Sequence, residues 1–206
     1  MFIELTDHLI CPEPHAEHFL VLLPSEMEGR RVVQGDLGCP VCRRVVRVRD
    51  GIADFGPASS PPALVEAPNR LTAQAVATFL GLGGPGGFVA LAGAVSAVAP
   101  DLIRLAPGIS LVLINPPLQV PDTIDASVIR APGLPLKTGS MRGVVLGADF
   151  APQTDWIEAA ERAVLPGLRV IAEGGAPSPG LELLAHHASC WVGLKRGTSR
   201  GPRAEF

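Results

Sequence analysis

The sequence predicts an α/β protein in two parts, a small β-rich metal-binding module followed by a doubly wound, mainly parallel sheet. Three observations lead to this prediction. Two cysteines form the motif Cys39-Pro40-Val41-Cys42, and an upstream counterpart begins at Cys11. A stretch rich in Pro, Ser and Ala covers residues 57–68. Beyond it, strand-like and helix-like segments alternate, which is typical of a parallel sheet covered on both faces.

The first part, residues 1–56, reads as a small β module. Short strands are predicted at 19–23 and 31–34, and valines mixed with arginine at 45–48 indicate a half-exposed strand. Asp50-Gly51 then forms a turn. So short a module has few apolar residues of its own and needs a staple such as a metal ion.

Four residues of this module are the candidate zinc ligands. The Cys39-Pro40-Val41-Cys42 turn aims two thiolates at one point, and a structural zinc site is closed by four nitrogen or sulfur ligands. Cys11 supplies the third ligand. Pro14 stands where a second upstream cysteine is usual, so we expect His15 as the fourth ligand, with His18 as the alternative.

Residues 57–68 are predicted to be a linker, residues 69–196 the α/β domain, and residues 197–206 a flexible tail. In the α/β domain Asn69 is a candidate N-cap, and a helix interruption is expected near Pro100. We expect strands at 88–92, 109–114, 127–129, 144–146, 168–172 and 190–194, and helices at 71–80, 95–105, 156–165 and 181–187.

Composition excludes some classes of function. The net charge of −3 gives no basic field for nucleic acid. Residues 71–100 carry no charge, but the glycines at 81–87 divide this run into two short halves, so we expect a turn there and no membrane span. Three of the cysteines fall in the metal motifs, which favours a reducing compartment, and no signal peptide is visible; a cytoplasmic protein is expected.

The first module resembles the small zinc-ribbon proteins that partner or precede methyltransferases. The similar segments are Leu9-Ile10-Cys11-Pro12, Gly38-Cys39-Pro40-Val41-Cys42 and the run from Val46 to Phe55, which contains Asp50-Gly51-Ile52. They cover about a quarter of the chain. The resemblance implies a structural zinc ion and a protein partner that docks on the ribbon.

The second part resembles a class I S-adenosylmethionine-dependent methyltransferase with a Rossmann-like sheet. Residues 133–146 are similar to the family's "Leu-Pro-Phe, turn, Ser-Phe-Asp, apolar strand" segment, and residues 160–171 to its helix, Pro-Gly turn and fifth strand. The resemblance implies S-adenosylmethionine as cofactor, with Gly93, Asn115 and Asp149 at the binding site. Gly93 is in the loop after the first strand, Asn115 follows the second strand, and Asp149 follows the fourth.

Several positions depart from the family's pattern. Val95 stands in the Gly-rich cofactor loop, and uncharged Asn115 stands where an acidic residue accepts the ribose hydroxyls. Arg130 and Arg142 occupy two further acidic positions. The family's sheet ends in a β-hairpin, whereas one strand is predicted here before the tail, so we expect a sheet truncated at its C-terminal end.

Other motifs are read as structural. Asn115-Pro116-Pro117-Leu118 resembles a catalytic loop of amino-group methyltransferases but follows the wrong strand, so we expect a turn. His186 and His187 are expected near a helix C-terminus, not as metal ligands.

Three functions stay open at this point. The first is a methyltransferase-like pseudoenzyme that acts as a binding or scaffold module, with the zinc ribbon as a docking surface. The second is an active methyltransferase with an unusual cofactor loop. The third is a zinc-stabilised interaction protein whose α/β domain never bound the cofactor.

Overall fold

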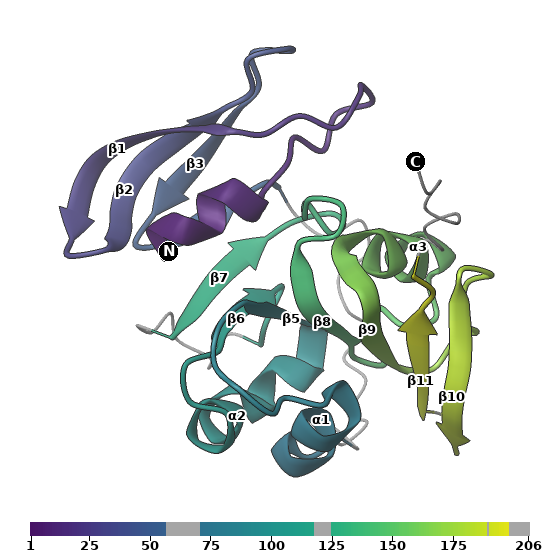
Figure 1. Ribbon diagram of the computed structural model, residues 1–206. Helices are drawn as coiled ribbons and strands as arrows, with labels where there is room; N and C mark the ends of the chain where they lie inside the picture. Colours follow the sequence, from purple (N-terminus) through teal and green to yellow (C-terminus); the bar gives the residue numbers. More distant parts are fainter. Residues whose placement is uncertain (57–70, 118–124, 189, 198–206) are drawn as a thin grey trace, which may run out of the picture.

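The structure, a computed structural model, describes residues 1–56, 71–117, 125–188 and 190–197. The predicted linker, the candidate cap Asn69 and nearly all of the predicted tail lie outside these residues. The described residues form a mixed α/β fold around one large sheet (Figure 1). Its strands run in the order β1-β2-β3-β4-β7-β6-β5-β8-β9-β11-β10.

The first four strands form an antiparallel meander at one end of the sheet. Residues 1–56, which contain these strands, are called the ribbon below. The strands are β1 (Val21–Glu28), β2 (Arg31–Gly38), β3 (Val45–Arg49) and β4 (Ile52–Asp54). Alternation is clearest in β3, where Val46 and Val48 are buried and their neighbours exposed. The three predicted strands of this module are therefore present, with β1 and β2 extending beyond the predicted ends.

The second part supplies five parallel strands. They are β5 (Phe88–Ala92), β6 (Ser110–Ile114), β7 (Ala126–Arg130), β8 (Met141–Leu146) and β9 (Val164–Glu173). The order β7-β6-β5-β8-β9 is the 3-2-1-4-5 order of a doubly wound sheet, which reverses between β5 and β8. Ligands of such sheets bind at that switch point, beyond the carboxyl ends of the strands.

The last part of the chain differs from the prediction. Residues 181–187 form strand β10 (Leu181–His187) and not a helix, and they pair antiparallel with β11 (Cys190–Lys195). β11 in turn pairs antiparallel with β9. The sheet therefore ends in a hairpin, and the prediction of a truncated sheet is wrong, as is the placing of His186 and His187 on a helix. The run Leu-Glu-Leu-Leu-Ala-His-His shows no strand alternation because six of its seven residues are exposed.

Helices cover the sheet on two sides. α1 (Ala73–Leu80), η2 (Gly93–Val98) and α2 (Ala99–Leu105) pack on one face, and α3 (Thr154–Ala163) packs on the other. Thr72 caps α1, because its Oγ1 accepts a hydrogen bond of 3.2 Å from the Ala75 N–H. Pro100 lies in the first turn of α2, where its missing N–H costs nothing. None of the described helices is long and apolar enough to cross a membrane.

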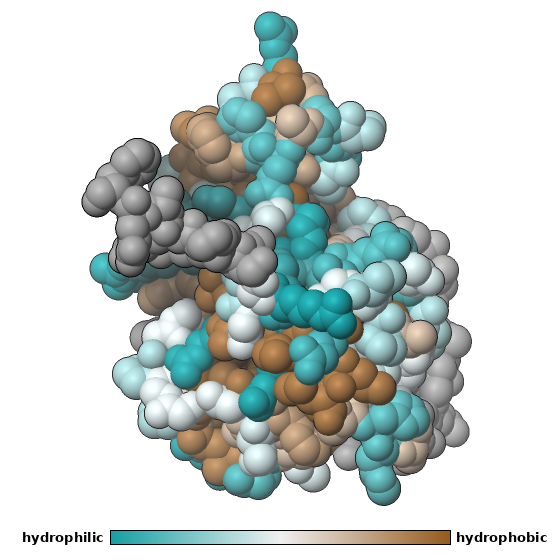
Figure 2. All heavy atoms as spheres, turned by 45° about the vertical axis from the view of Figure 1, so that its right-hand side comes forward, coloured by the Kyte–Doolittle hydropathy of each residue, from teal (hydrophilic) through white to brown (hydrophobic). Residues whose placement is uncertain are grey.

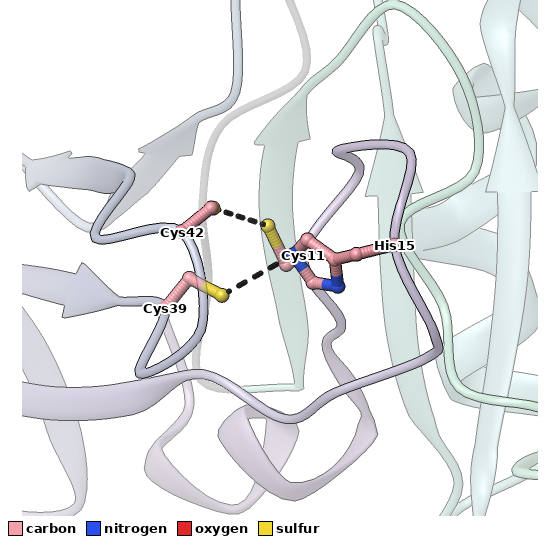
Figure 3. A group of neighbouring side chains, drawn as sticks. All are labelled: Cys11, His15, Cys39 and Cys42. Atoms are coloured by element: carbon pink, nitrogen blue, oxygen red, sulfur yellow. Dashed lines mark hydrogen bonds between the residues drawn. The ribbon is translucent and has the colours of Figure 1, made fainter.

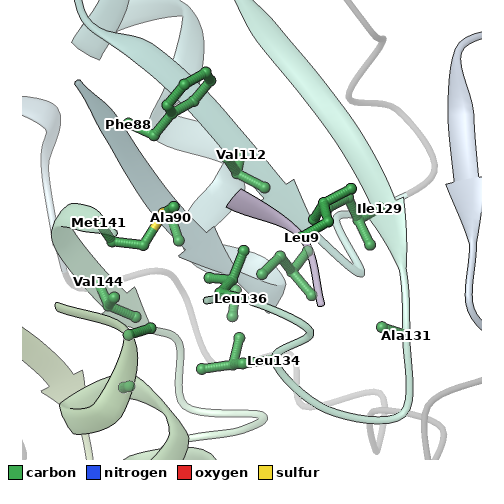
Figure 4. Close-up of a cluster of buried hydrophobic side chains, with 14 of the residues drawn as sticks. Leu9, Phe88, Ala90, Val112, Ile129, Ala131, Leu134, Leu136, Met141 and Val144 are labelled. Atoms are coloured by element: carbon green, nitrogen blue, oxygen red, sulfur yellow. The ribbon is translucent and has the colours of Figure 1, made fainter. Parts of the chain in front are cut away.

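The N-terminal segment covers the part of the sheet that no helix reaches. η1 (Ile3–His8) and the residues after it lie on the same face as α3, over β5, β6 and β7. Leu9 is fully buried beside Val112, Ile129 and Leu136 (Figure 4). Backbone hydrogen bonds also hold the segment in place: Ile10 N–H donates to Pro135 O at 3.0 Å, and Lys137 N–H donates to His8 O at 2.8 Å. Parallel strands are usually connected by a helix, and here the N-terminal segment and the non-helical connection 131–140 share that position.

The ribbon and the parallel strands are also continuous through the backbone. β4 pairs parallel with β7, with Ala53 opposite Ile129, and the Phe55 N–H donates to Arg130 O at 2.7 Å. One hydrophobic core contains side chains of both parts, such as Leu37 of the ribbon and Leu146 of β8. The ribbon therefore both covers an edge of the parallel strands and contributes to their core.

We predict that Leu9→Ala lowers the free energy of unfolding by about 2–5 kcal/mol, because it leaves a cavity between the N-terminal segment and the sheet. Urea titration followed by tryptophan fluorescence measures the loss, since Trp156 and Trp191 lie in the same core as Leu9. Leu23→Ala is the matched control, because the Leu23 side chain is 65% exposed on β1. Equal effects of the two substitutions would contradict the packing described above.

Candidate metal centre and ligand-binding edge

The four predicted zinc ligands converge on one point. Ligand atoms of Cys11, His15, Cys39 and Cys42 all lie within 4.8 Å of one another (Figure 3). Cys11 Sγ is 3.6 Å from Cys42 Sγ, and Cys39 Sγ is 3.5 Å from His15 Nε2. A tetrahedron with Zn–S bonds of about 2.3 Å and Zn–N bonds of about 2.0–2.1 Å has edges of roughly 3.5–3.8 Å. The donor set and its spacing therefore fit Zn²⁺.

Local backbone geometry presents the ligands. In the turn 39–42, Cys39 N–H donates to Arg44 O at 2.8 Å and Arg43 N–H donates back to Cys39 O at 3.0 Å. Arg43 adopts a positive φ of 62° to close this turn. The opposite ligands come from the loop after η1, where Cys11 N–H donates to His18 O at 3.1 Å. Of the two candidate histidines, His15 lies in the cluster, whereas His18 lies outside it with its Nδ1 3.3 Å from Phe19 O.

The candidate ligands differ in protonation: the pKa of His15 is raised to about 9, chiefly by its hydrogen bond to Ala16, so binding of a metal ion would release protons. Burial opposes the charged form of Cys39, but backbone N–H groups of Cys42 and Val41 outweigh it and lower the pKa of this thiol to about 6. Burial raises the pKa of the Cys11 thiol to about 11, so a metal ion has to displace its proton. His15 Nδ1 lies 2.7 Å from Ala16 O, and this contact favours the tautomer that leaves Nε2 free for the metal.

Four charged residues, Glu13, Glu17, Arg44 and Arg162, tie the loop that contains Cys11 and His15 to the rest of the fold, and the sequence did not identify them. Arg44 pairs with Glu13 and donates to Phe55 O at 2.8 Å. Glu17 accepts from the Thr138 hydroxyl at 2.6 Å and from Arg162 at 3.3 Å. Nothing in one sequence distinguishes these residues from ordinary surface charges. A cavity of about 460 Å³ lies beside them, between residues 10–17 of the metal loop and residues 131–135.

The three predicted cofactor residues lie together at the carboxyl ends of β5, β6 and β8. Ala92 of β5 is opposite both Ile114 of β6 and Leu146 of β8, so Gly93 and Asn115 follow neighbouring strands. Asp149 comes back over Gly93: its Oδ2 accepts a hydrogen bond of 3.0 Å from the Ala94 N–H. The sequence therefore placed these residues at the correct edge, which is the switch point of the sheet.

The space above Gly93 is filled by Asp149. A Cβ atom on Gly93 would lie 2.1 Å from Asp149 Oδ1 and 2.2 Å from Oδ2. Gly93 also has a φ of +79°, which favours glycine at this position. Burial raises the pKa of Asp149, and its Oδ1 is buried with no hydrogen-bond partner among the described residues. The glycine thus makes room for a carboxylate of the protein itself.

The side-chain amide of Asn115 is also hydrogen-bonded within the protein. Its Nδ2 donates to Ala131 O at 2.7 Å, and its Oδ1 accepts from the Ala131 N–H at 2.9 Å. Asn115 holds a φ of +49°, and Val95 is fully buried in the loop after β5. Arg142, at an expected acidic position, donates to the carbonyls of Gly84, Pro85 and Gly86 and orders the predicted glycine-rich turn. Arg142 lies at the amino end of β8, so the fit to S-adenosylmethionine depends on Asn115 and Asp149, whose polar groups are bonded within the protein in this arrangement.

Comparison with known proteins gives a weak structural likeness. No protein-family model matches the chain, and no curated protein matches it. The antibiotic-resistance methyltransferase Kmr is 15% identical, with a TM-score of 0.41 over 62% of this chain and 94% of that chain. A putative methyltransferase of an antibiotic biosynthesis pathway from Anabaena variabilis ATCC 29413 is 16% identical, with a TM-score of 0.41 over 56% and 47% of the two chains.

A third similar structure is CalO1, a methyltransferase in calicheamicin biosynthesis solved in its SAH-bound form. It is 15% identical, with a TM-score of 0.38 over 59% of this chain and 54% of that chain.

We predict that His15→Ala weakens zinc binding at least about 10-fold, because it removes one of four ligands. His18→Ala, three residues away, should leave the affinity unchanged. Competition with a chromophoric chelator measures both, and metal analysis of the purified parent should give about one equivalent of zinc. Equal loss in the two variants, or less than about half an equivalent in the parent, would contradict the assigned ligand set.

We also predict that Gly93→Ala destabilises the protein by more than about 2 kcal/mol, through both the positive φ and the contact with Asp149. In an Asp149→Ala background the cost should fall, because only the backbone strain remains. A double-mutant cycle from thermal or urea unfolding gives the coupling between the two residues. A coupling free energy indistinguishable from zero would show that Asp149 does not fill the space above Gly93.

Proposed function

We propose that this chain is a methyltransferase-like protein that works without S-adenosylmethionine, as a zinc-stabilised binding or scaffold module. One observation carries the proposal: the Asp149 carboxylate fills the space above Gly93, at the switch point of the sheet. The methyltransferase-like character is supported by the doubly wound strand order and the terminal β10–β11 hairpin. In this proposal the edge where such folds bind ligands is present, but the Asp149 side chain fills it.

A bound cofactor needs free polar groups as well as free space. The backbone N–H of Ala94, in the loop after β5, already donates its hydrogen bond to Asp149. The amide of Asn115, which stands where a ribose acceptor is expected, is bonded in both directions to Ala131. Binding would require both arrangements to break, and each broken hydrogen bond in a buried place costs about 1–3 kcal/mol.

The zinc centre supports a structural role. Three cysteines and one histidine close a tetrahedral site, whereas a catalytic zinc ion keeps one position open for water or substrate. Zinc bound there would cross-link the metal loop to the turn 39–42 and hold both against the sheet. Because thiolate sites of this kind persist in a reducing compartment, we infer a cytoplasmic protein.

We further propose that a protein partner docks on the ribbon. Its surface near the metal site exposes apolar side chains that the fold leaves without cover, namely Phe19, Val41 and Val45, each more than half exposed. Exposed apolar groups gathered on one small module are typical of protein-interaction surfaces. The surface is neutral in character, because Arg47 lies directly opposite Asp36 and Asp54 in the sheet.

We predict that isothermal titration calorimetry with S-adenosylmethionine, and separately with S-adenosylhomocysteine, shows no binding at ligand concentrations up to about 1 mM, a limit that corresponds to roughly −4 kcal/mol. The zinc-loaded protein is the sample, and metal analysis of the same preparation is the control for folding. A dissociation constant in the micromolar range for either compound would overturn the pseudoenzyme proposal in favour of an active methyltransferase.

A further inference from the structure

Strand β10 is an open edge of the sheet. Among the described residues it pairs only with β11, so one row of its backbone N–H and C=O groups has no strand beside it. Every residue of β10 except Leu181 is exposed. The strand therefore extends past the core. Leu183 and Leu184 are 50% and 44% exposed, and Figure 2, which turns this end of the sheet forward, shows apolar side chains there bordered by hydrophilic ones.

The opposite edge of the same sheet is protected, and β10 is less so. β1 contains Pro24, which has no N–H to donate, and its pairing with β2 shifts register twice between Pro24 and Met27. Prolines and bulges of this kind prevent further strand addition. β10 contains no proline or glycine, one acidic residue and one register shift, at Leu184. Of the two edges, β10 is therefore the better template for another strand.

We propose that β10 is the docking edge for a second copy of this chain, whose own β10 pairs with it antiparallel across a twofold axis. This contact goes beyond the proposed function and does not depend on it. A twofold axis brings the same strand together in opposite directions, so the strand has to complement itself. β10 meets this condition, because its acidic residue, Glu182, lies near one end and His186 and His187 lie at the other.

Acidic and imidazole side chains meet in either of the two symmetric pairings whose twofold axis lies near the middle of β10. If the axis passes through Leu184, Glu182 lies opposite His186 of the second copy. If it passes between Leu184 and Ala185, Glu182 lies opposite His187. Either arrangement gives two imidazole–carboxylate pairs per dimer and brings the exposed leucines of the two copies together. Directly opposite side chains in an antiparallel pair are close enough to interact.

Strand β1 does not satisfy the same condition. Its charged residues, Glu26 and Glu28, share one end of the strand, so symmetric pairing would bring no opposite charge to meet them. An extended peptide from another protein would lack the twofold constraint and would have no requirement for acid and imidazole at opposite ends. The distribution of charge along β10 thus favours a second copy over a foreign strand.

Sedimentation velocity of the zinc-loaded protein, from about 5 to about 200 µM, tests the proposal. A contact made by one short strand is at the small end of protein interfaces, so we expect a dissociation constant on the order of 10 µM. The double variant Leu183→Lys, Leu184→Lys should weaken association at least about 10-fold, since lysine blocks strand addition. Leu23→Lys, at the 65% exposed position on β1, is the matched control and should leave the dimer unchanged.

Charge exchange separates the proposed pairing from general surface effects. Glu182→Lys alone should weaken the dimer, because the lysine faces an imidazole. Adding His186→Glu and His187→Glu to it should restore association, because the charges are then exchanged at both ends. A monomer at every concentration, equal loss in the Leu23→Lys control, or no restoration in the triple variant would each overturn the proposal. Circular dichroism of each variant confirms folding, and these results are independent of cofactor titration.

Discussion

The packing of the N-terminal segment onto the parallel strands is the interaction on which the other features depend. Leu9 is buried among residues of β6, β7 and the 131–140 connection, and the backbone around it bonds to Pro135 and Lys137. Without this segment, which includes η1, one face of β5, β6 and β7 would lie open, because no other described helix covers it. The ribbon is thus an integral part of the α/β fold: it covers both a face and an edge of the sheet.

This arrangement connects the cluster of Cys11, His15, Cys39 and Cys42 with the α/β part of the chain. The loop that contains Cys11 and His15 follows Leu9 directly. Glu17 of this loop accepts a hydrogen bond from Thr138, on the connection before β8. Ala131, at the start of the same connection, holds Asn115 at the carboxyl edge of the sheet. The connection 131–140 therefore contacts both the loop that contains Cys11 and His15 and the edge of the sheet that contains Asn115.

Much of this fold could be predicted from residue patterns, and the errors have physical causes. β5 is a continuous apolar run, β6 is one after Ser110, and β8 ends in Val144-Val145-Leu146, while the motif Cys39-Pro40-Val41-Cys42 identified half of the candidate metal site. β10 was predicted as a helix because six of its seven residues are exposed. A strand without a buried face has no alternation of apolar and polar residues in its sequence. The hydrogen bond from Ala94 to Asp149 joins residues 55 apart in sequence, and no local sequence pattern indicates it. The same is true of Glu17 and Arg44, whose partners come from other elements.

The central claim is that the ligand-binding edge is filled by the protein's own side chains. Nuclear magnetic resonance of the backbone amides of Gly93 and Ala94 and the side-chain amide of Asn115 tests it most directly. On addition of S-adenosylhomocysteine to about 1 mM, these resonances should not move, whereas Asp149→Asn should move those of Gly93 and Ala94, which contact the carboxylate. A saturable shift of all three groups on adding the ligand to the parent protein would contradict the claim.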